Sequence, residues 1–178
     1  FCIIPKLRGK YRSRSPEALL AEAEALAASG VKELIVIAQD ITRYGTDLPE
    51  RTSLAWLVKE LCKLNFHWIR LHYLYPEAIT DELIGVIASE PKVLHYLDIP
   101  IQHCNDGILK AMRRRNTKAE LTALLDRLRE AMPDVVIRTS LICGLPGEGE
   151  AEFEELCGFL REQKLQRVGV FQFSPEEG

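Results

Sequence analysis

The chain has 178 residues, of which 47% are hydrophobic and 28% charged, and its formal net charge is -3. This length and apolar content suit one globular domain, and no apolar run approaches the roughly 20 residues that a membrane span requires. The slightly acidic balance argues against a domain that mainly grips nucleic acid, and the first residues show no signal-peptide pattern, so we expect a cytoplasmic protein.

A helix and a buried strand are expected first along the chain. Ser15 is a suitable N-cap for a helix that Pro16 opens, and residues 18–28 are rich in strong helix formers. Gly30 is expected to end this helix. The continuous apolar run 34–37 is typical of a strand buried in a parallel sheet.

The alternation of helix and strand continues to the end of the chain. Helices are expected over residues 53–64, from 80 onward, and over 106–114, 118–132 and 150–163, and strands over 68–72, 94–101, 135–142 and 168–173. Five strands, each preceded by a helix, predict a parallel α/β sheet that is either doubly wound or curved like a barrel. In both arrangements ligands bind at the carboxyl ends of the strands.

Polar and aromatic side chains gather at these strand ends. They are Gln39 and Asp40 after the first strand, Gln102 after the third, Arg138 in the fourth and Phe171 in the fifth, and Pro100 lies beside Gln102. A carboxylate such as Asp40 is suited to hold an ammonium group. An arginine facing the interior, such as Arg138, needs an anionic partner, which is either a ligand carboxylate or a structural Asp or Glu.

Gly144 and Gly147 enclose a turn between the fourth strand and the last helix. Two glycines let the backbone approach a flat ligand, and free N–H groups are present where the helix begins. A phosphate, an adenine edge or a carboxylate would fit there, and a plain strand-to-helix turn is the alternative. The spacing is not G-x-G-x-x-G, which disfavours a dinucleotide site.

The five cysteines are scattered and include no C-x-x-C pair, so the chain as it stands holds no complete metal site. Cys62 and Cys157 lie in helical patterns and are expected to be small core residues. A metal shared by Cys2, Cys104 and Cys143 is disfavoured for want of a local pair. His72 and His103 are acid–base candidates, although a structural histidine is the favoured interpretation of each.

In combination, these motifs resemble the radical S-adenosylmethionine (SAM) methylthiotransferases. Phe1-Cys2-Ile3-Ile4-Pro5, Arg8-Gly9 and Ser13-Arg14-Ser15 resemble the stretch that closes the family's C-x-x-x-C-x-x-C loop, with Cys2 as the third cysteine. The other two cysteines and the first strand of the family's barrel would lie upstream. The resemblance covers essentially all 178 residues.

The further motifs resemble the branch that modifies an aspartate of small-subunit ribosomal protein twelve. They are Ala38-Gln39-Asp40, Tyr44-Gly45, Tyr75-Pro76, Tyr96 to His103, Met112-Arg113-Arg114 and Gly144-Leu145-Pro146-Gly147-Glu148. The tRNA-modifying branch usually reads Gly-Gln-Asn at 38–40 and His-Leu-Pro-Val-Gln-Ser at 98–103.

The resemblance implies a partial (βα)6 TIM-like barrel, of which this chain would hold five strands, without the first strand and most of the cluster loop. Residues 1–178 would form a radical SAM core truncated at its N-terminus. The flanking domains, a cluster-bearing one before the core and an RNA-binding-type β domain after it, would lie outside this chain.

The implied cofactors are a [4Fe-4S] cluster and SAM, whose reductive cleavage yields the radical that starts methylthio transfer. The implied roles place Cys2 on the cluster, Gln39 and Asp40 by the methionyl amino group, and Arg138 and Gln102 by the carboxylate or ribose, with Pro100 in the same site. Gly144 and Phe171 would lie by the adenine. No side chain is assigned as catalytic.

The implied partners are the ribosomal protein as substrate and a flavodoxin or ferredoxin as electron donor, without a membrane and without direct nucleic-acid binding by this domain. With one cluster cysteine, the isolated chain is expected to be inactive. The alternatives are a tRNA adenosine methylthiotransferase and a cluster-free barrel lyase or binding fragment. A Schiff-base lyase would need a lysine inside a strand end, and no expected strand carries one.

Overall fold

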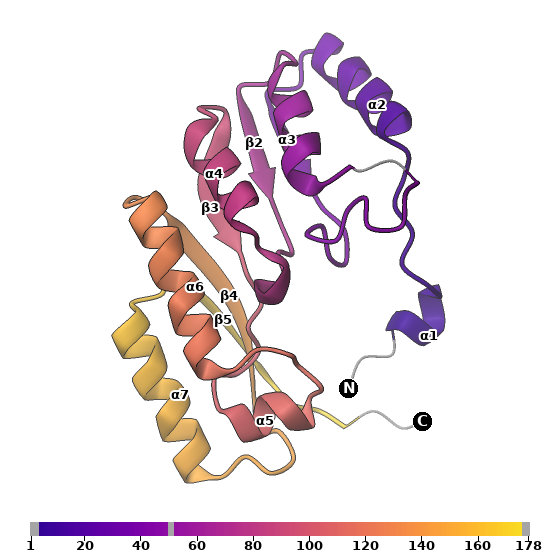
Figure 1. Ribbon diagram of the computed structural model, residues 1–178. Coiled ribbons are helices and arrows are strands. Elements are labelled where there is room, and N and C mark those ends of the chain that lie inside the picture. The colour runs from indigo at the N-terminus through magenta and orange to yellow at the C-terminus, as the bar shows by residue number, and fades with distance from the viewer. Residues whose placement is uncertain (1–3, 50–51, 176–178) are drawn as a thin grey trace. The chain divides into compact units, whose positions relative to one another are not determined.

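The computed structural model describes residues 4–49 and 52–175, and the chain divides into two compact units. The first consists of Phe1–Leu74 and Ala78–His95, and the second of Tyr75–Glu77 and Tyr96–Gly178. Figure 1 shows helices and strands alternating along the chain, as the sequence predicts.

The first unit pairs two parallel strands with helices. Its elements are α1 (Ile4–Arg8), α2 (Pro16–Ala28), β1 (Glu33–Val36), α3 (Leu54–Cys62), β2 (Trp68–Leu71) and α4 (Asp81–Ser89). Leu34 pairs with Ile69, and Val36 with Leu71. Helix α3 packs beside both α2 and α4. The buried sides of β2, α3 and α4 together form an apolar core in this unit.

Local signals explain where α2 begins and ends. The Ser15 hydroxyl accepts a hydrogen bond from the Ala18 N–H at 3.3 Å, and Pro16 occupies the first turn. Gly30 has a φ of +89°, and the N–H of Val31 donates to Leu26 O, which is the Schellman end that a glycine favours. The prediction for this helix is confirmed at both ends.

The second unit is a parallel sheet with two long helices. Its elements are the carboxyl end of β3 (Val93–Asp98), then α5 (Asp106–Ala111), α6 (Lys118–Ala131), β4 (Val136–Cys143), α7 (Glu150–Gln163) and β5 (Arg167–Gln172). Strand β4 pairs in parallel with β3 on one side and β5 on the other. Figure 1 shows α6 and α7 running along β4 and β5.

Alternation along β4 separates two faces of this sheet. Ile137, Thr139 and Leu141 are buried, as are the apolar sides of α6 and α7, which include Leu125 and Phe159. The alternate residues 138, 140 and 142 are only partly buried. Because directly paired residues point to the same side, the partners of 138, 140 and 142 on β5 share that second face.

Two element ends differ from the predictions by three residues, and several others differ by one or two. Strand β3 ends at Asp98 rather than at 101, because Pro100 has no N–H to continue the ladder. Helix α5 ends at Ala111 rather than at 114, because Arg113 adopts a φ of +56°. The short helix α1 and the 3-10 turn η1 (Pro76–Ala78) were not expected. The predicted α/β class with five strands is confirmed.

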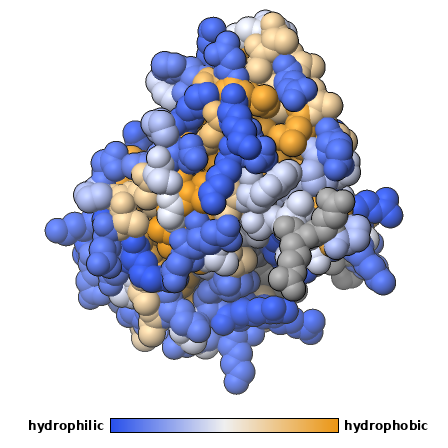
Figure 2. Space-filling model, turned by 45° about the horizontal axis from the view of Figure 1, so that its top comes forward, coloured by the Kyte–Doolittle hydropathy of each residue, from blue (hydrophilic) through white to orange (hydrophobic). Residues whose placement is uncertain are grey.

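No helix within the described ranges is long and apolar enough to cross a membrane. Figure 2 shows hydrophobic side chains, in orange, reaching a surface that is mostly hydrophilic. Ile35 and Ile37, next to each other on one side of the β1 region, are 49% and 60% exposed. Isoleucine side chains are usually buried in folded proteins. Ile35 and Ile37 therefore form an exposed apolar area on this side of β1.

Candidate functional site

The expected cluster ligand Cys2 lies outside the described residues. Among residues 4–49 and 52–175, no group of three or more His, Cys, Asp or Glu side chains is placed to hold a metal ion. Burial raises the pKa of Cys62 to about 11 and that of Cys104 to about 12, so both are buried thiols with little thiolate character. The burial of Cys62 is consistent with its expected role as a small core residue, whereas Cys157 is only partly buried.

Gln39 and Asp40 follow β1 in the first unit. Gln39 is exposed, and Asp40 is half-buried. Asp40 Oδ1 accepts hydrogen bonds from both the N–H, at 3.0 Å, and the hydroxyl of Thr42, which forms a tight local turn. The carboxylate is therefore held in one orientation by its own loop, directly after the strand end.

The segment that follows the expected cluster loop is bonded to the same loop after β1. The Tyr11 hydroxyl donates to the Asp40 carbonyl at 3.1 Å, and the Arg43 guanidinium lies 5.0 Å from the Tyr11 ring centre. Ser13 is held twice, because its N–H donates to Asp47 Oδ2 at 2.8 Å and its hydroxyl accepts from the Gly45 N–H at 3.1 Å. These bonds connect residues 10–15 with residues 40–47.

A glycine is required at position 45, where the segment of residues 10–15 meets the loop of residues 40–47. Its φ is +85°, and a Cβ at this position would lie 2.2 Å from Thr52 O. A side chain would therefore clash with backbone as well as strain the loop. The hydrogen bonds of Ser13 to the loop of residues 45–47 depend on this close approach.

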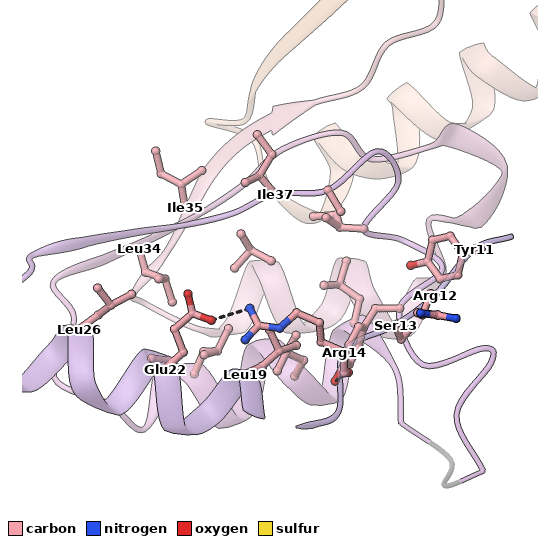
Figure 3. Close-up of a pocket in the computed structure, with 18 residues that line it drawn as sticks. Tyr11, Arg12, Ser13, Arg14, Leu19, Glu22, Leu26, Leu34, Ile35 and Ile37 are labelled. Atoms are coloured by element: carbon pink, nitrogen blue, oxygen red, sulfur yellow. Dashed lines mark hydrogen bonds and ion pairs between the residues drawn. The ribbon is translucent and has the colours of Figure 1, made fainter. Parts of the chain in front are cut away.

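A cavity of about 410 Å³ lies between α2, β1 and α3 in the first unit. Figure 3 shows Leu19 and Leu26 of α2 facing Leu34 across it, with Tyr11 and Arg12 at one end. Arg14 and Glu22 form an exposed ion pair at 2.5 Å beside the cavity. Neither Gln39 nor Asp40 lines it, so this mainly apolar cavity is not the predicted cofactor site.

Arg138 is the cation of the second unit's candidate site. Register places it opposite Asp98 on β3, and its Nη1 lies 2.5 Å from Asp98 Oδ1. The Asp98 side chain is 1% exposed, whereas that of Arg138 is 34% exposed. The structural acid that was the alternative partner for Arg138 is thus present, and the guanidinium still reaches the open face of the sheet.

Pro100 and Gln102 lie in the irregular segment after β3. Gln102 has a φ of +71°, its N–H donates to Ser140 O, and its carbonyl accepts from the Ile142 N–H, both at 2.9 Å. Pro100 is buried, and its carbonyl accepts from Arg114 Nη2 at 3.2 Å. Gln102 therefore lies beside the carboxyl half of β4, whereas Pro100 lies between Ile99 and Ile101, which are bonded to Arg138 and Thr139.

Gly144 begins the turn after β4 with a φ of +80°, and Gly147 follows with a φ of +89°. The N–H of Leu145 donates to Glu148 Oε2 at 2.9 Å, and the N–H of Glu148 donates back to the Leu145 carbonyl at 2.9 Å. The turn is therefore closed by the Glu148 carboxylate. A Cβ at Gly144 would meet nothing within 4 Å, so space for a flat ligand is open there.

Phe171 is opposite Ile142 in the register of β4 and β5 and is 58% exposed. It thus lies on the same face of the sheet as Arg138, which pairs with Arg167 further down β5. Five predicted residues, Pro100, Gln102, Arg138, Gly144 and Phe171, belong to the second unit, and Gln39 and Asp40 belong to the first.

Sequence reasoning assigned no role to the contact between His103 and Glu148. His103 is fully buried, and its Nε2 lies 3.6 Å from Oε1 of Glu148, whose side chain is 3% exposed. Burial lowers the pKa of His103, and this outweighs the opposite effect of the Glu148 carboxylate. The sequence does hold one signal for this contact. His103 directly follows Gln102, and Glu148 directly follows Gly147, so both lie next to residues of the predicted site or turn.

Comparison with known families identifies the class of protein to which this alternating fold belongs. The family model described as the radical SAM superfamily matches residues 1–160, and the chain belongs to this superfamily. Its members bind a [4Fe-4S] cluster and SAM.

Within that class, the chain is similar to proteins described as ribosomal protein uS12 methylthiotransferase RimO. The relative from Anaeromyxobacter sp. (strain Fw109-5) is 53% identical over 100% of this chain, and the relative from Myxococcus xanthus is 54% identical over 100%. The chain covers 38% and 37% of these relatives, so it spans less than half of their length.

Solved structures show the same fold at low sequence identity. The radical SAM methyltransferase TsrM from Kitasatospora setae, with cobalamin and a [4Fe-4S] cluster bound, matches with a TM-score of 0.71 at 14% identity, over 89% of this chain and 31% of that one. SuiB from Streptococcus suis, bound to SAM, matches with a TM-score of 0.64 at 14% identity, over 96% and 36%. The predicted partial-barrel class is confirmed.

Proposed function

We propose that this chain is the radical SAM core of a longer enzyme that adds a methylthio group to an aspartate of ribosomal protein uS12. The observation that carries the proposal is 53% identity along the whole chain to a protein described by that activity. Two motifs that distinguish this branch from the tRNA-modifying branch, Ala38-Gln39-Asp40 and Asp98 to His103, both lie at strand ends.

The cluster would require Cys2 and two cysteines upstream of it, since the described residues offer no metal site of their own. When bound, a [4Fe-4S] cluster supplies the electron that cleaves SAM. The other residues of this chain would bind and orient SAM. The restrained carboxylate of Asp40, with Gln39, would hold the amino group, and Arg138 and Gln102 would contact the carboxylate or ribose.

The adenine would lie by Gly144 and Phe171, where the glycine turn leaves open space and an exposed ring lies on the face that Arg138 shares. Aromatic rings and glycine backbone suit a flat heterocycle. Pro100 would border the same pocket, with Gln102 fixed to β4 by two backbone hydrogen bonds.

The parts beyond residues 1–178 would carry the second cluster and the RNA-binding-type domain. The enzyme would work in the cytoplasm, where its ribosomal substrate is made, and would take electrons from a flavodoxin or ferredoxin. This domain would contact neither a membrane nor nucleic acid directly.

The test uses the full-length enzyme, purified without oxygen and reconstituted with iron and sulfide. Given SAM, sulfide and a reductant, it is expected to add one methylthio group to an aspartate of uS12, detected by peptide mass spectrometry. The Cys2→Ala variant is the matched control and is expected to give neither product nor deoxyadenosine. Methylthiolation of tRNA adenosine instead of uS12 would place the enzyme in the other branch, and iron-independent activity would favour a cluster-free barrel.

A further inference from the structure

His103 and Glu148 are two buried titratable residues to which the proposed function gives no role. His103 follows Gln102 in the segment after β3, and Glu148 ends the turn that Gly144 begins after β4. Their side chains are 0% and 3% exposed, and His103 Nε2 is 3.6 Å from Glu148 Oε1. Burying a carboxylate costs folding free energy unless polar partners compensate it. The burial of Glu148 beside His103 is therefore expected to have a function.

The hydrogen bonds of His103 identify its tautomer. Its Nδ1 accepts from the Asn105 N–H at 2.9 Å and therefore carries no proton. Burial lowers the pKa of the ring and favours the neutral form. The single ring proton is then on Nε2, which has no hydrogen-bond partner among the described residues and faces Glu148. At 3.6 Å the contact is electrostatic, and a small movement of the turn would convert it to a hydrogen bond.

Further contacts hold the His103 side of this pair. Asn105 caps α5 through its side-chain oxygen, and its Nδ2 donates to Glu155 on α7 at 2.7 Å. Lys118 Nζ donates to the same carboxylate at 3.0 Å. Glu155 and Glu152 of α7, like Glu148, favour the charged form of His103, but burial outweighs all three. The ring is thus fixed from the side opposite Glu148.

The carboxylate of Glu148 connects the ring with the turn. Its Oε2 accepts from the Leu145 N–H, while its Oε1 faces the His103 ring. The backbone of Gln102 is bonded to β4 at Ser140 and Ile142, directly before the turn. The pair therefore joins the two segments of the second unit to which the proposed function assigns SAM contacts.

We propose that His103 is a positioning residue which, through Glu148, holds the Gly144 turn in register with the Gln102 segment and thereby sets the affinity for SAM. The inference rests on the proposed function for the identity of the ligand. Groups that orient metal ligands change metal affinity or activity by about 10- to 100-fold when removed, and we expect an effect at the low end of this range for a group that orients SAM-contacting segments.

Two variants of His103 separate this role from simple core packing. In His103→Gln the side-chain amide nitrogen replaces Nε2 as the donor to Glu148, whereas in His103→Asn the amide oxygen replaces only Nδ1 as the acceptor from Asn105. In the full-length reconstituted enzyme, we expect His103→Asn to weaken SAM binding about tenfold and His103→Gln to bind SAM within about threefold of the parent. The rate of deoxyadenosine formation at saturating SAM is expected to change little in either.

Glu148→Gln tests the same pair from the other side. An amide has one acceptor, so it loses either the Leu145 N–H or the His103 Nε2–H, whichever way it is turned. We expect the same loss of SAM affinity as in His103→Asn, and the double variant is expected to be no weaker than either single one, because each substitution breaks the same connection from His103 through Glu148 to Leu145. This variant replaces His103→Asn if the latter does not fold, as judged by circular dichroism.

The inference is overturned if His103→Asn and Glu148→Gln bind SAM as the parent does, or if His103→Gln loses as much affinity as His103→Asn. Independent losses that add in the double variant would also contradict it. SAM binding is measured by equilibrium dialysis with radiolabelled SAM, apart from methylthio transfer. A parent that binds and cleaves SAM without modifying uS12 would refute the proposed function and leave this test intact.

Discussion

At the scale of single residues, Thr139 shows how β4 holds the irregular segment after β3. Its hydroxyl is fully buried, donates to the Ile99 carbonyl at 2.8 Å and accepts from the Ile101 N–H at 3.2 Å. Pro100, between these two residues, has no N–H and interrupts the backbone ladder. One side chain thus replaces the backbone partners that a regular strand would have supplied.

Replacing Thr139 by Val is expected to remove both hydrogen bonds without changing the shape of the side chain. Leaving buried backbone groups unpaired costs about 1–3 kcal/mol. We expect the amide of Ile101 to exchange its hydrogen faster in Thr139→Val, as measured by hydrogen–deuterium exchange on the full-length protein. Thr139→Ser is the control, because it retains the hydroxyl and loses a methyl group. Equal exchange in Thr139→Val and the parent would show that the hydroxyl does not hold this segment.

At the scale of elements, the end of α5 depends on one residue in the left-handed region. Arg113 has a φ of +56°, its N–H donates to Lys110 O at 3.0 Å, and the N–H of Arg114 donates to Leu109 O at 2.8 Å. This is a Schellman motif with arginine where glycine is usual. It turns Arg114 back so that its guanidinium lies 4.9 Å from the Tyr75 ring centre.

Arg113→Gly is expected to stabilise the protein by about 0.5 kcal/mol, because the relief of left-handed strain exceeds the added flexibility of the unfolded chain. Arg115→Gly is the matched control, since Arg115 is an exposed neighbour without a positive φ, and it is expected to destabilise. Thermal melting of the two variants should therefore shift in opposite directions. A lower melting temperature for Arg113→Gly would indicate that the arginine side chain contributes more than its backbone strain costs.

At the scale of the whole molecule, the residues expected to bind SAM belong to two compact units. Gln39 and Asp40 are in the first and the other five in the second. Within the first unit, the described segment of residues 10–15 is bonded to the loop of residues 40–47 through Tyr11 and Ser13.

The 178-residue chain alone is expected to make no deoxyadenosine, even after treatment with iron, sulfide and a strong reductant. It contains no C-x-x-x-C-x-x-C motif, and a [4Fe-4S] cluster with an open iron requires three thiolates. Chromatographic analysis of the SAM reaction checks this. Deoxyadenosine formed by the chain, and lost in Cys2→Ala, would mean that another residue completes the cluster site.

Much of the fold was predictable because its signals are local. Ser15, Ser53 and Thr80 cap helices where the sequence predicts helix starts, and the five segments predicted as strands form the five strands. The predicted end of β3 was wrong although the sequence holds a local signal for it, because Pro100 has no N–H to continue the ladder. The predicted end of α5 was wrong because no pattern in the chain predicts that Arg113 adopts a positive φ. The candidate site was predicted from strand ends and a family resemblance, and its SAM contacts remain predictions.

The sequence by itself determined the order of helices and strands, the strand ends at which polar residues gather and the family, because each depends on residues near one another in the chain. Only the tertiary structure decided which polar groups pair. Asp98 meets Arg138, and His103 meets Glu148, across 40 and 45 positions of sequence. Those contacts follow from the register of β3 against β4 and from burial, and neither is encoded in a local pattern.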